Sequence, residues 1–353
     1  MGADLQPRSS RISSYPVEEY DAYIAAQPGV TPYHSSSWLL ASERAYGHTG
    51  WLVTAHRDGK LCGVLPLVEV KPPIGPAGLV SLPFCDVAGP LADNDDIRDL
   101  LTQEAKKLAA SNKAKSLEIR EGGPLLETPE ETKPTAGSGK VRMLCQLPDN
   151  AEALFKSYKP KLRSQIRKAE KNGLTAEIRT DIEAIDGFYQ VFAWNMHRLG
   201  SPVHSKDWFR ELKQAYGDRM LVGLVFFESK PVGAGIVLLA GDQACIPWAS
   251  TLEEYNRLAP NMLLYWTLLS HVCNQGCKQF DFGRSTIDEG TYRFKKQWGA
   301  RPHQLKWTDW MMDTNPQQSS VSRLRPLIEN IWRRMPLAMA NWIGPKLRRY
   351  ITL

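Results

Sequence analysis

The densest group of chemically useful side chains lies in one block of twenty residues, 280–299, with the sequence FDFGRSTIDEGTYRFKKQWG. An apolar stretch leads into a glycine-containing turn that carries Asp281 and Arg284, followed by Arg293 and Lys295. Ligands commonly bind where the strands of α/β sheets end, and a lysine among aromatic rings can stabilise a developing oxyanion. The alternative interpretation is a salt-bridged turn without a catalytic role.

A helix with a cationic face is the second candidate. Pro160 suits the first turn of a helix and Gly173 suits the position after its end, so a well-bounded helix is expected between them. Residues 156–171 contain seven basic residues and one acid, and Arg163 and Arg167 lie one turn apart on one face. Such a row suits phosphates, in RNA or in a nucleotide-linked substrate, whereas the plainer interpretation is a solvated helix face.

Three further groups are weaker candidates. His197 and His204 have the chemistry of a general base, although a histidine of this kind is more often structural. Trp248 lines a pocket in one interpretation and packs in the core in the other. Cys273 and Cys277 share one helix face and suit packing. Because no C-x-x-C pair is present, a tetrahedral metal site is not expected.

The two halves of the chain share one order of predicted elements. Residues 57–68 align without gaps with residues 227–238, with a lysine and a glycine at matching positions. Each segment belongs to a hairpin, and the Asp-Gly pair at 58–59 is a strong turn signal. A long helix and a strand follow each hairpin. This shared order predicts an internal duplication that produces two α/β domains of the same design.

Composition restricts the class of protein. The 353 residues carry a formal charge of +6 and are 42% hydrophobic, which suits two globular domains and excludes global disorder. The charge excess is small and no RNA-binding signature is present, so DNA is not an expected partner. The N-terminus lacks the apolar stretch of a secretory signal, and the six scattered cysteines suit a reducing compartment. A cytoplasmic location is therefore expected.

The tail, residues 321–353, differs in kind from the rest of the chain. It carries seven basic residues and one acid among apolar residues, and three prolines divide it into short helices. Basic amphipathic helices that contain tryptophan can lie on anionic membranes, so contact with the inner face of a membrane is one expectation for this tail.

Several of these segments resemble the FemAB-type proteins, and specifically the subgroup associated with PEP-CTERM/exosortase systems. The resemblance covers nearly the whole chain, and its longest motifs are KLRSQIRKAEKNG at 161–173, NMHRLGSP at 195–202 and the block 280–299. Shorter matches are YHSSSW at 33–38, GVLPLV at 63–68, SLPF at 81–84 and PNMLLYW at 260–266.

The resemblance implies an α/β protein with tandem GNAT-like (acyl-CoA N-acyltransferase) domains, each with a mixed sheet flanked by helices, and a C-terminal helical tail. We expect the first domain at residues 1–145, the second at 146–312 and the tail at 313–353, packed on the first domain. Proteins of the family transfer aminoacyl groups from aminoacyl-tRNA to an amine of a peptidoglycan precursor. The subgroup is linked instead to exopolysaccharide and protein-sorting gene sets.

The resemblance also implies roles for individual residues. Phe294 and Lys295 match the Phe-Lys pair at the family's catalytic centre, where the lysine is thought to stabilise the transition state. The basic helix falls near the start of the second domain, where the family binds phosphorylated substrate between its domains. We expect Asp281 or a bound water to help remove the proton of the attacking amine. The residues expected to bind substrate are Arg163, Arg167, Trp248, Arg284, Tyr292 and Arg293.

One departure from the usual GNAT pattern concerns the acyl donor. GNAT enzymes place Gln/Arg-x-x-Gly-x-Gly/Ala before a helix, so that bare backbone amides hold the CoA pyrophosphate. The corresponding turn here, from Arg257 to Asn261, has no glycine, and Pro260 removes one amide donor. Arg257 and Asn261 are the expected contacts if CoA binds, but the departure favours another carrier. Aminoacyl-tRNA, acyl-carrier protein and acyl-CoA stay open as donors, and no tightly bound cofactor is expected.

The leading hypothesis is an N-acyltransferase that moves an acyl or aminoacyl group from an activated carrier to an amine of a cell-envelope precursor. The acceptor is a peptidoglycan peptide or an exopolysaccharide amino sugar. Positioning would supply much of the rate, because a neutral amine is already a good nucleophile. The alternative is a degenerate acyltransferase fold that serves as an assembly or membrane-docking protein, which the basic tail motivates.

Overall fold

The computed structural model describes residues 5–127, 139–311 and 329–353. The chain forms two compact units, each assembled from segments that lie far apart in the sequence. Of the described residues, unit 1 contains 5–123, 305–311 and 348–353, and unit 2 contains 124–127, 139–304 and 329–347.

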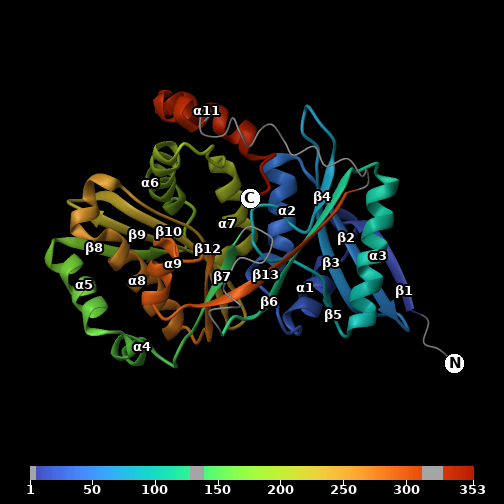
Figure 1. The fold of residues 1–353 in the computed structure, drawn as a ribbon, viewed down its shortest axis with the longest axis horizontal. Helices are drawn as coiled ribbons and strands as arrows, with labels where there is room; N and C mark the ends of the chain where they lie inside the picture. The colour runs from blue at the N-terminus through green and yellow to red at the C-terminus, as the bar shows by residue number, and fades with distance from the viewer. Residues whose placement is uncertain (1–4, 128–138, 312–328) are drawn as a thin grey trace. The chain divides into compact units, whose positions relative to one another are not determined.

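Unit 1 is a sheet with helices on both faces (Figure 1). Its strand order is β1-β2-β3-β4-β6, with β5 paired to β3; β4 and β6 are parallel, and the other pairs are antiparallel. The strands are β1 (Leu5–Arg11), β2 (Thr49–Arg57), β3 (Lys60–Val70), β4 (Gly78–Val80), β5 (Leu91–Ala92) and β6 (Ser116–Leu125). The helices are α1 (Val17–Ala25), α2 (Ser36–Tyr46) and α3 (Asp95–Ser111).

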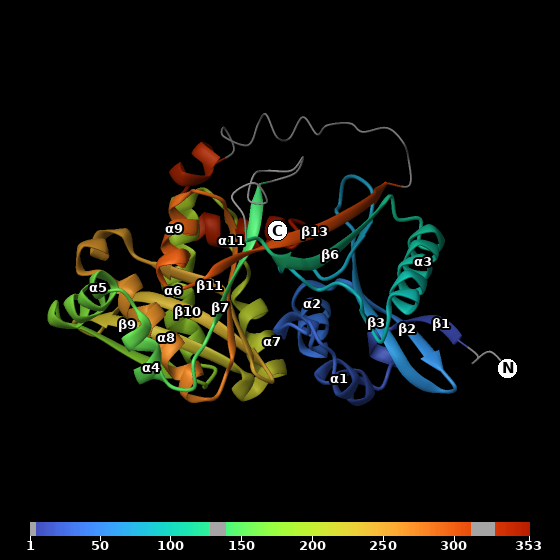
Figure 2. The same ribbon diagram turned by 60° about the horizontal axis from the view of Figure 1, so that its bottom comes forward.

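Two glycines show how closely helices approach the sheet of unit 1. A Cβ at Gly50 would lie 3.0 Å from Leu39 of α2, and a Cβ at Gly63 would lie 2.5 Å from Ile97 of α3. Gly50 pairs with Val68, an odd number of positions along β3 from Gly63, so the two glycines face opposite sides of the sheet. Helices α2 and α3 therefore cover opposite faces (Figure 2).

Unit 2 repeats this design on a larger scale. Its strand order is β13-β7-β12-β11-β10-β9-β8; β11 and β12 are parallel and the other pairs are antiparallel. The strands are β7 (Lys140–Gln146), β8 (Leu174–Arg179), β9 (Met220–Phe227), β10 (Lys230–Ala240), β11 (Gln243–Thr251), β12 (Gln279–Thr286) and the first four residues of β13 (Arg301–Met311). The helices are α4 (Ala151–Ser157), α5 (Pro160–Lys171), α6 (Ala184–Leu199), α7 (Lys206–Tyr216), α8 (Pro260–Asn274), α9 (Gly290–Gln297) and α11 (Leu337–Arg348), whose last residue belongs to unit 1.

Helices α6 and α8 cover opposite faces of the unit 2 sheet (Figure 1). A Cβ at Gly223 would lie 2.8 Å from Leu268 of α8, and a Cβ at its strand partner Gly235 would lie 3.3 Å from the same side chain. The next residue of β9, Leu224, points the other way, where a Cβ at Gly187 of α6 would meet it at 3.3 Å. Glycine at these positions lets the helices pack directly on the sheet.

The two hairpins confirm the predicted duplication. In both two-residue turns each residue has a positive φ, 51° and 78° at Asp58-Gly59 and 48° and 67° at Glu228-Ser229. These are the values of the primed turns that suit the twist of a hairpin. Each hairpin also has one register shift, which leaves an extra residue at the matching positions Cys62 and Val232.

The described part of the C-terminal tail is divided between the units, which differs from the expectation that all of it packs on the first domain. In unit 2, Trp332 and Ala340 are buried, and a Cβ at Gly344 would lie 3.0 Å from the backbone nitrogen of Val203. In unit 1, the carbonyl of Thr352 accepts a hydrogen bond from the Phe84 N–H at 2.7 Å. Small and apolar side chains anchor the helix, whereas backbone hydrogen bonds anchor the end of the chain.

The rest of the predicted tail, residues 313–328, lies outside the described residues. Across the described ranges, the structure contains no helix with both the length and the apolar character that a bilayer span requires.

Candidate active site

The parallel strands β11 and β12 part within the sheet of unit 2. Three residue pairs join them, ending at Cys245 and Asp281. Beyond these residues both strands continue without pairing with each other, and β12 stays bonded to β7 after an irregularity between Asp281 and Arg284. Such a position, at the carboxyl ends of parallel strands, is where α/β sheets commonly bind ligands.

Asp281 lies at the point where the strands part and is 3% exposed. Its Oδ2 accepts a hydrogen bond from Arg142 Nε of β7 at 2.7 Å, and its Oδ1 accepts one from the Gly283 N–H at 2.7 Å. Both carboxylate oxygens are therefore engaged, one of them in a charge-assisted bond. This arrangement suits a residue that holds the irregular part of β12 in place, and a role in proton removal would require one of these bonds to open.

Lys295 approaches the same stretch of β12 from α9. Its side chain is largely buried, and Nζ donates hydrogen bonds to the carbonyl oxygens of Gly283 at 3.2 Å and Arg284 at 2.8 Å. Residues 283 and 284 are thus held by Asp281 through a backbone N–H and by Lys295 through two carbonyls. The result is a positive charge in a fixed place beside the parted strands.

Aromatic rings surround α9 on its inner side. The Phe294 ring lies 4.9 Å from that of Tyr265 and 6.2 Å from that of Trp298, and Tyr265 stacks on Phe282 at 5.7 Å. Burial raises the pKa of Tyr265, so its phenol keeps its proton at neutral pH. The sequence analysis assigned Tyr265 no role, although the motif PNMLLYW contains it; its neighbours come from other elements, which a linear motif does not reveal.

The remaining predicted residues of this block divide into two kinds. Tyr292 is buried, and burial raises its pKa. Arg293 is exposed and donates to the backbone carbonyl of Asp288 at 3.0 and 2.7 Å, so it closes the turn that precedes α9. Arg284 is half-buried and meets Lys295 through its backbone carbonyl.

Trp248, which was predicted to bind substrate, is buried. It packs among buried rings on the α7 side of the sheet, 5.0 Å from Phe209, 5.9 Å from His204 and 6.4 Å from Trp208. These contacts favour the core interpretation of its ring, and its role in substrate binding stays a prediction. His197 likewise has a structural contact, since its Nε2 lies 2.7 Å from the carbonyl oxygen of Met335 in the tail.

The two arginines of the basic helix stay a prediction. Arg163 and Arg167 lie on α5, which packs on α8 and β8. Arg163 is half-buried, while Arg167 is exposed, with its guanidinium 5.3 Å from the centre of the Phe155 ring. None of the contacts described for α9 includes them.

The turn before α8 has the conformation that glycine usually adopts, but without glycine. Ala259 has a φ of 64°, in the left-handed region, and Pro260 is the first residue of the helix. Such a conformation costs about 1–3 kcal/mol for a residue other than glycine. Arg257 is exposed on the preceding 3₁₀-helix Glu253–Leu258, and Asn261 is half-buried in the first turn of α8. In the ranges that the structure covers, no cluster of three or more His, Cys, Asp or Glu side chains could hold a metal ion.

Comparison with known proteins shows which proteins this chain is similar to. The profile of the acetyltransferase (GNAT) domain matches residues 156–296, which span α5 to α9 and contain the site at Lys295. The lipid II:glycine glycyltransferase of Staphylococcus aureus (strain bovine RF122 / ET3-1) is 24% identical over 80% of this chain and 88% of its own length. The crystal structure of FemX superposes with a TM-score of 0.67 at 17% identity, over 91% of this chain and 100% of that one. The chain is therefore similar to FemAB-type proteins over most of its length, and we refer to it below as the FemAB-like protein.

A tandem GNAT protein from the clavulanic acid biosynthesis pathway, 12% identical, superposes on the FemAB-like protein with a TM-score of 0.53 over 89% of this chain and 100% of that one. The tandem GNAT-like fold predicted from the sequence is thereby confirmed, with mixed sheets flanked by helices and helices at the C-terminus. The FemAB-like protein is an acyltransferase. The roles of its individual residues stay predictions.

Proposed function

We propose that the FemAB-like protein transfers an aminoacyl group from an activated ester to an amine of a cell-envelope precursor. The amine attacks the ester carbonyl, the carbonyl electrons move onto oxygen, and the carrier's oxygen then leaves with the bonding electrons while the amine loses a proton. The relatives named as lipid II:glycine glycyltransferases support an acceptor of the peptidoglycan class.

The observation that carries this proposal is the buried ammonium of Lys295 beside the parted strands. An oxyanion needs a charge that is already in place and shielded from water. The bonds from Lys295 to the carbonyls of Gly283 and Arg284 hold the ammonium there before substrate binds. The Tyr265 ring packs against Phe294, so it helps to position α9, which carries Lys295.

We propose aminoacyl-tRNA, and not free CoA, as the donor. The usual pyrophosphate site of a GNAT domain needs bare amides from glycines before the helix. Here that turn contains Ala259 and Pro260, which add a side chain and remove one N–H. The cations of α5, among them Arg163 and Arg167, are available for the phosphates of the donor or of the precursor.

A reconstituted transfer assay tests the reaction. Purified protein is incubated with labelled aminoacyl-tRNA or acyl-CoA and either a lipid-linked peptidoglycan precursor or an amino-sugar oligomer. We expect product from aminoacyl-tRNA, and we expect Lys295→Ala to lower the rate about 10²–10³-fold, the usual effect of losing an oxyanion donor. Lys296→Ala, which removes the exposed neighbouring cation, is the matched control.

Three outcomes contradict parts of this proposal. Full activity of Lys295→Ala would remove that residue from the mechanism. Product from acyl-CoA alone would overturn the choice of donor. Absence of product from every donor and acceptor would favour the alternative, an assembly protein on a degenerate acyltransferase fold.

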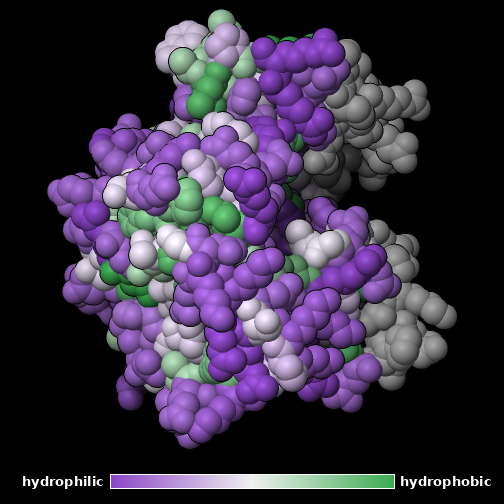
Figure 3. All heavy atoms as spheres, turned by 90° about the vertical axis from the view of Figure 1, so that its left-hand side faces the viewer, coloured by the Kyte–Doolittle hydropathy of each residue, from purple (hydrophilic) through white to green (hydrophobic). Residues whose placement is uncertain are grey.

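We also propose the finer assignment to the exosortase-associated subgroup and a peripheral contact of α11 with the inner face of the membrane. Trp342 is 66% exposed on α11, and Lys346 Nζ lies 3.5 Å from the centre of its ring. Figure 3 shows apolar and hydrophilic residues mixed at the top of the view, where α11 lies. Equal sedimentation of wild type and Trp342→Ala with anionic liposomes would contradict the proposed membrane contact of α11. Transfer to a peptidoglycan precursor but not to an amino-sugar oligomer would contradict the assignment to the exosortase-associated subgroup.

A further inference from the structure

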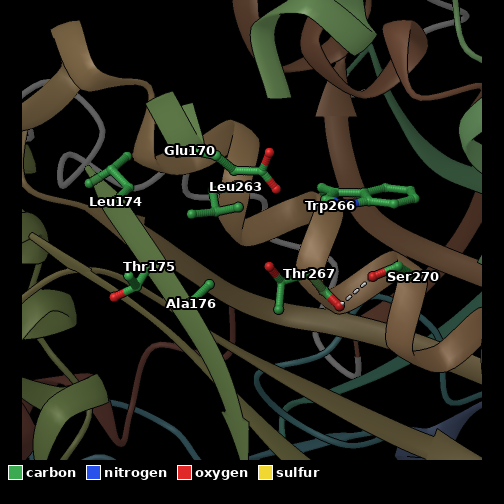
Figure 4. Close-up of a pocket in the computed structure, with 8 residues that line it drawn as sticks. All are labelled: Glu170, Leu174, Thr175, Ala176, Leu263, Trp266, Thr267 and Ser270. Carbon is green, nitrogen blue, oxygen red and sulfur yellow. Dashed lines mark hydrogen bonds between the residues drawn. The ribbon is translucent and has the colours of Figure 1, made fainter. Parts of the chain in front are cut away.

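An open cavity of about 360 Å³ lies at the surface of unit 2, between α5, α8 and β8 (Figure 4). This volume is at the lower end of the range of about 300–1,000 Å³ that is typical of small-molecule sites. Strand β8 is the last strand of its sheet, so this cavity lies at the edge of the sheet and not where β11 and β12 part. Its lining residues are Glu170, Leu174, Thr175, Ala176, Leu263, Trp266, Thr267 and Ser270.

Glu170 is the most unusual of the lining residues. It is the single acid among seven basic residues in the segment 156–171, and it lies in the last turn of α5. A carboxylate there opposes the helix dipole, which favours cations at a helix C-terminus. The exposed positions of this helix are otherwise cationic or polar, so local helix stability does not account for an acid at the wall of the cavity.

The opposite wall combines an aromatic ring with hydroxyl groups from one face of α8. Trp266 is half-buried, and its ring is backed by Phe155 at 5.0 Å. Thr267 and Ser270 contribute hydroxyls, and Ser270 Oγ donates to the Thr267 carbonyl at 3.1 Å, which leaves its oxygen lone pairs able to accept. Figure 4 shows Glu170 from α5 and these three residues from α8 around one space.

We propose that this cavity binds a neutral hexopyranose unit of a glycan. One face of the sugar ring stacks on Trp266, and two neighbouring sugar hydroxyls donate to the carboxylate of Glu170. The hydroxyls of Thr267 and Ser270 bond the remaining sugar oxygens, while Leu174 and Leu263 contact the apolar face. The site is separate from the transfer chemistry at Lys295 and gives the protein a means to hold the sugar portion of a polymer or precursor.

The lining chemistry favours this ligand over the other classes. A purely apolar ligand would offer no hydrogen-bond partner to the Glu170 carboxylate or to the Thr267 hydroxyl. An ammonium group would be repelled by the seven cations of the segment 156–171. A neutral polyol satisfies the acceptors and the hydroxyls without adding a charge.

Ligand-observed NMR with the full-length protein tests the proposal. The probes are glucose, N-acetylglucosamine and their short oligomers, with a linear diamine as the competing class. We expect saturable saturation transfer from the protein to at least one of the sugars, and we expect Glu170→Gln to weaken that binding about tenfold or more, as for loss of a hydrogen bond to a charged group. Thr267→Val should weaken it less, since it removes one neutral hydroxyl.

Glu152→Gln is the matched control, because Glu152 is an exposed acid of the neighbouring α4 that does not line the cavity. Equal sugar binding by wild type and Glu170→Gln would overturn the proposal, as would binding of the diamine without any sugar. Lys295→Ala should bind the sugar as wild type does. Failure of transfer in the earlier assay and failure of sugar binding are therefore separate results.

Discussion

Two buried cations lie at corresponding strands of the two units and differ in the segments of chain that they contact. Arg120 of β6 is fully buried and donates to three carbonyl oxygens, of Leu82, Cys85 and Thr352. Lys295 lies against β12, the matching strand of unit 2, and donates to two carbonyls of β12 itself. Arg120 thus joins segments that are distant in the chain, whereas Lys295 is held by one strand.

The difference follows from how the strands part in each unit. In unit 1 the chain leaves β4 but returns to β6, where the Ser81 N–H bonds the Glu118 carbonyl at 2.8 Å and the Ala88 N–H bonds the Arg120 carbonyl at 3.0 Å. In unit 2, β11 leaves β12 after Asp281 and does not pair with it again. A guanidinium has five donors in a rigid fork and suits the first environment, while a compact ammonium suits a charge presented to a substrate.

The largest expected effect is a loss of stability on substitution of Arg120, which distinguishes its structural role from the catalytic role proposed for Lys295. Arg120→Met should lower the free energy of unfolding by about 3–5 kcal/mol, because the carbonyls and Glu118 would lose a buried charged partner. Urea denaturation measures this change, and transfer per folded molecule should stay unchanged, the reverse of the profile expected for Lys295→Ala. Lys107→Met, at an exposed cation of α3, should stay within about 0.5 kcal/mol of wild type. If Arg120→Met were as stable as wild type but inactive in transfer, the structural role assigned to Arg120 would be contradicted.

A smaller effect concerns the end of the chain in unit 1. Burial lowers the pKa of His48 to about 4, and its Nε2 lies 2.9 Å from the Arg349 carbonyl oxygen. The unfolded chain takes up a proton below its ordinary pKa of about 6.5 while the folded chain does not, so stability falls as the pH drops from about 6.5 to 4. The loss should reach about 3 kcal/mol in denaturation curves recorded over this range. His48→Gln should flatten that part of the profile, and an unchanged profile would contradict the assignment.

The smallest expected effect tests whether the two hairpins are equivalent. Ser229 and Gly59 occupy matching turn positions with φ of 67° and 78°. Gly59→Ser should cost about 1 kcal/mol, since a side chain disfavours this conformation, and Ser229→Gly should change stability in the opposite direction by a smaller amount, because glycine also makes the unfolded chain more flexible. Melting temperatures of both variants measure the effects. Changes of the same sign in the two turns would show that they are not equivalent.

Much of the fold could be predicted from local patterns. The Asp-Gly turn, the helix before Gly173 and the matched order of elements are each encoded within a few residues, and the structure shows all three. Within the block 280–299, the structure places Lys295 against Gly283 and Arg284 of β12. The role of Lys295 in transfer stays a prediction.

Other features depended on partners that no local pattern reveals. Trp248 has the same apolar character whether it lines a pocket or packs in the core, and only its contacts with Phe209 and His204 place it in the core. In the sequence, Asp281 has the chemistry of a general base. In the structure, one of its carboxylate oxygens accepts a hydrogen bond from Arg142, which is 139 residues away in the chain. The tail carried one composition throughout, yet its contacts divide it between the two units.

The amino-acid sequence determined the hairpins, the helix ends, the duplication and the lysine that follows β12, because these depend on backbone preferences and spacing within short stretches of chain. The tertiary structure decided which buried charge ties the core together and which lies beside parted strands. It also decided that Glu170 and Trp266 share a cavity. Burial and hydrogen-bond partners come from residues far apart in the chain, so they are set only when the elements have packed.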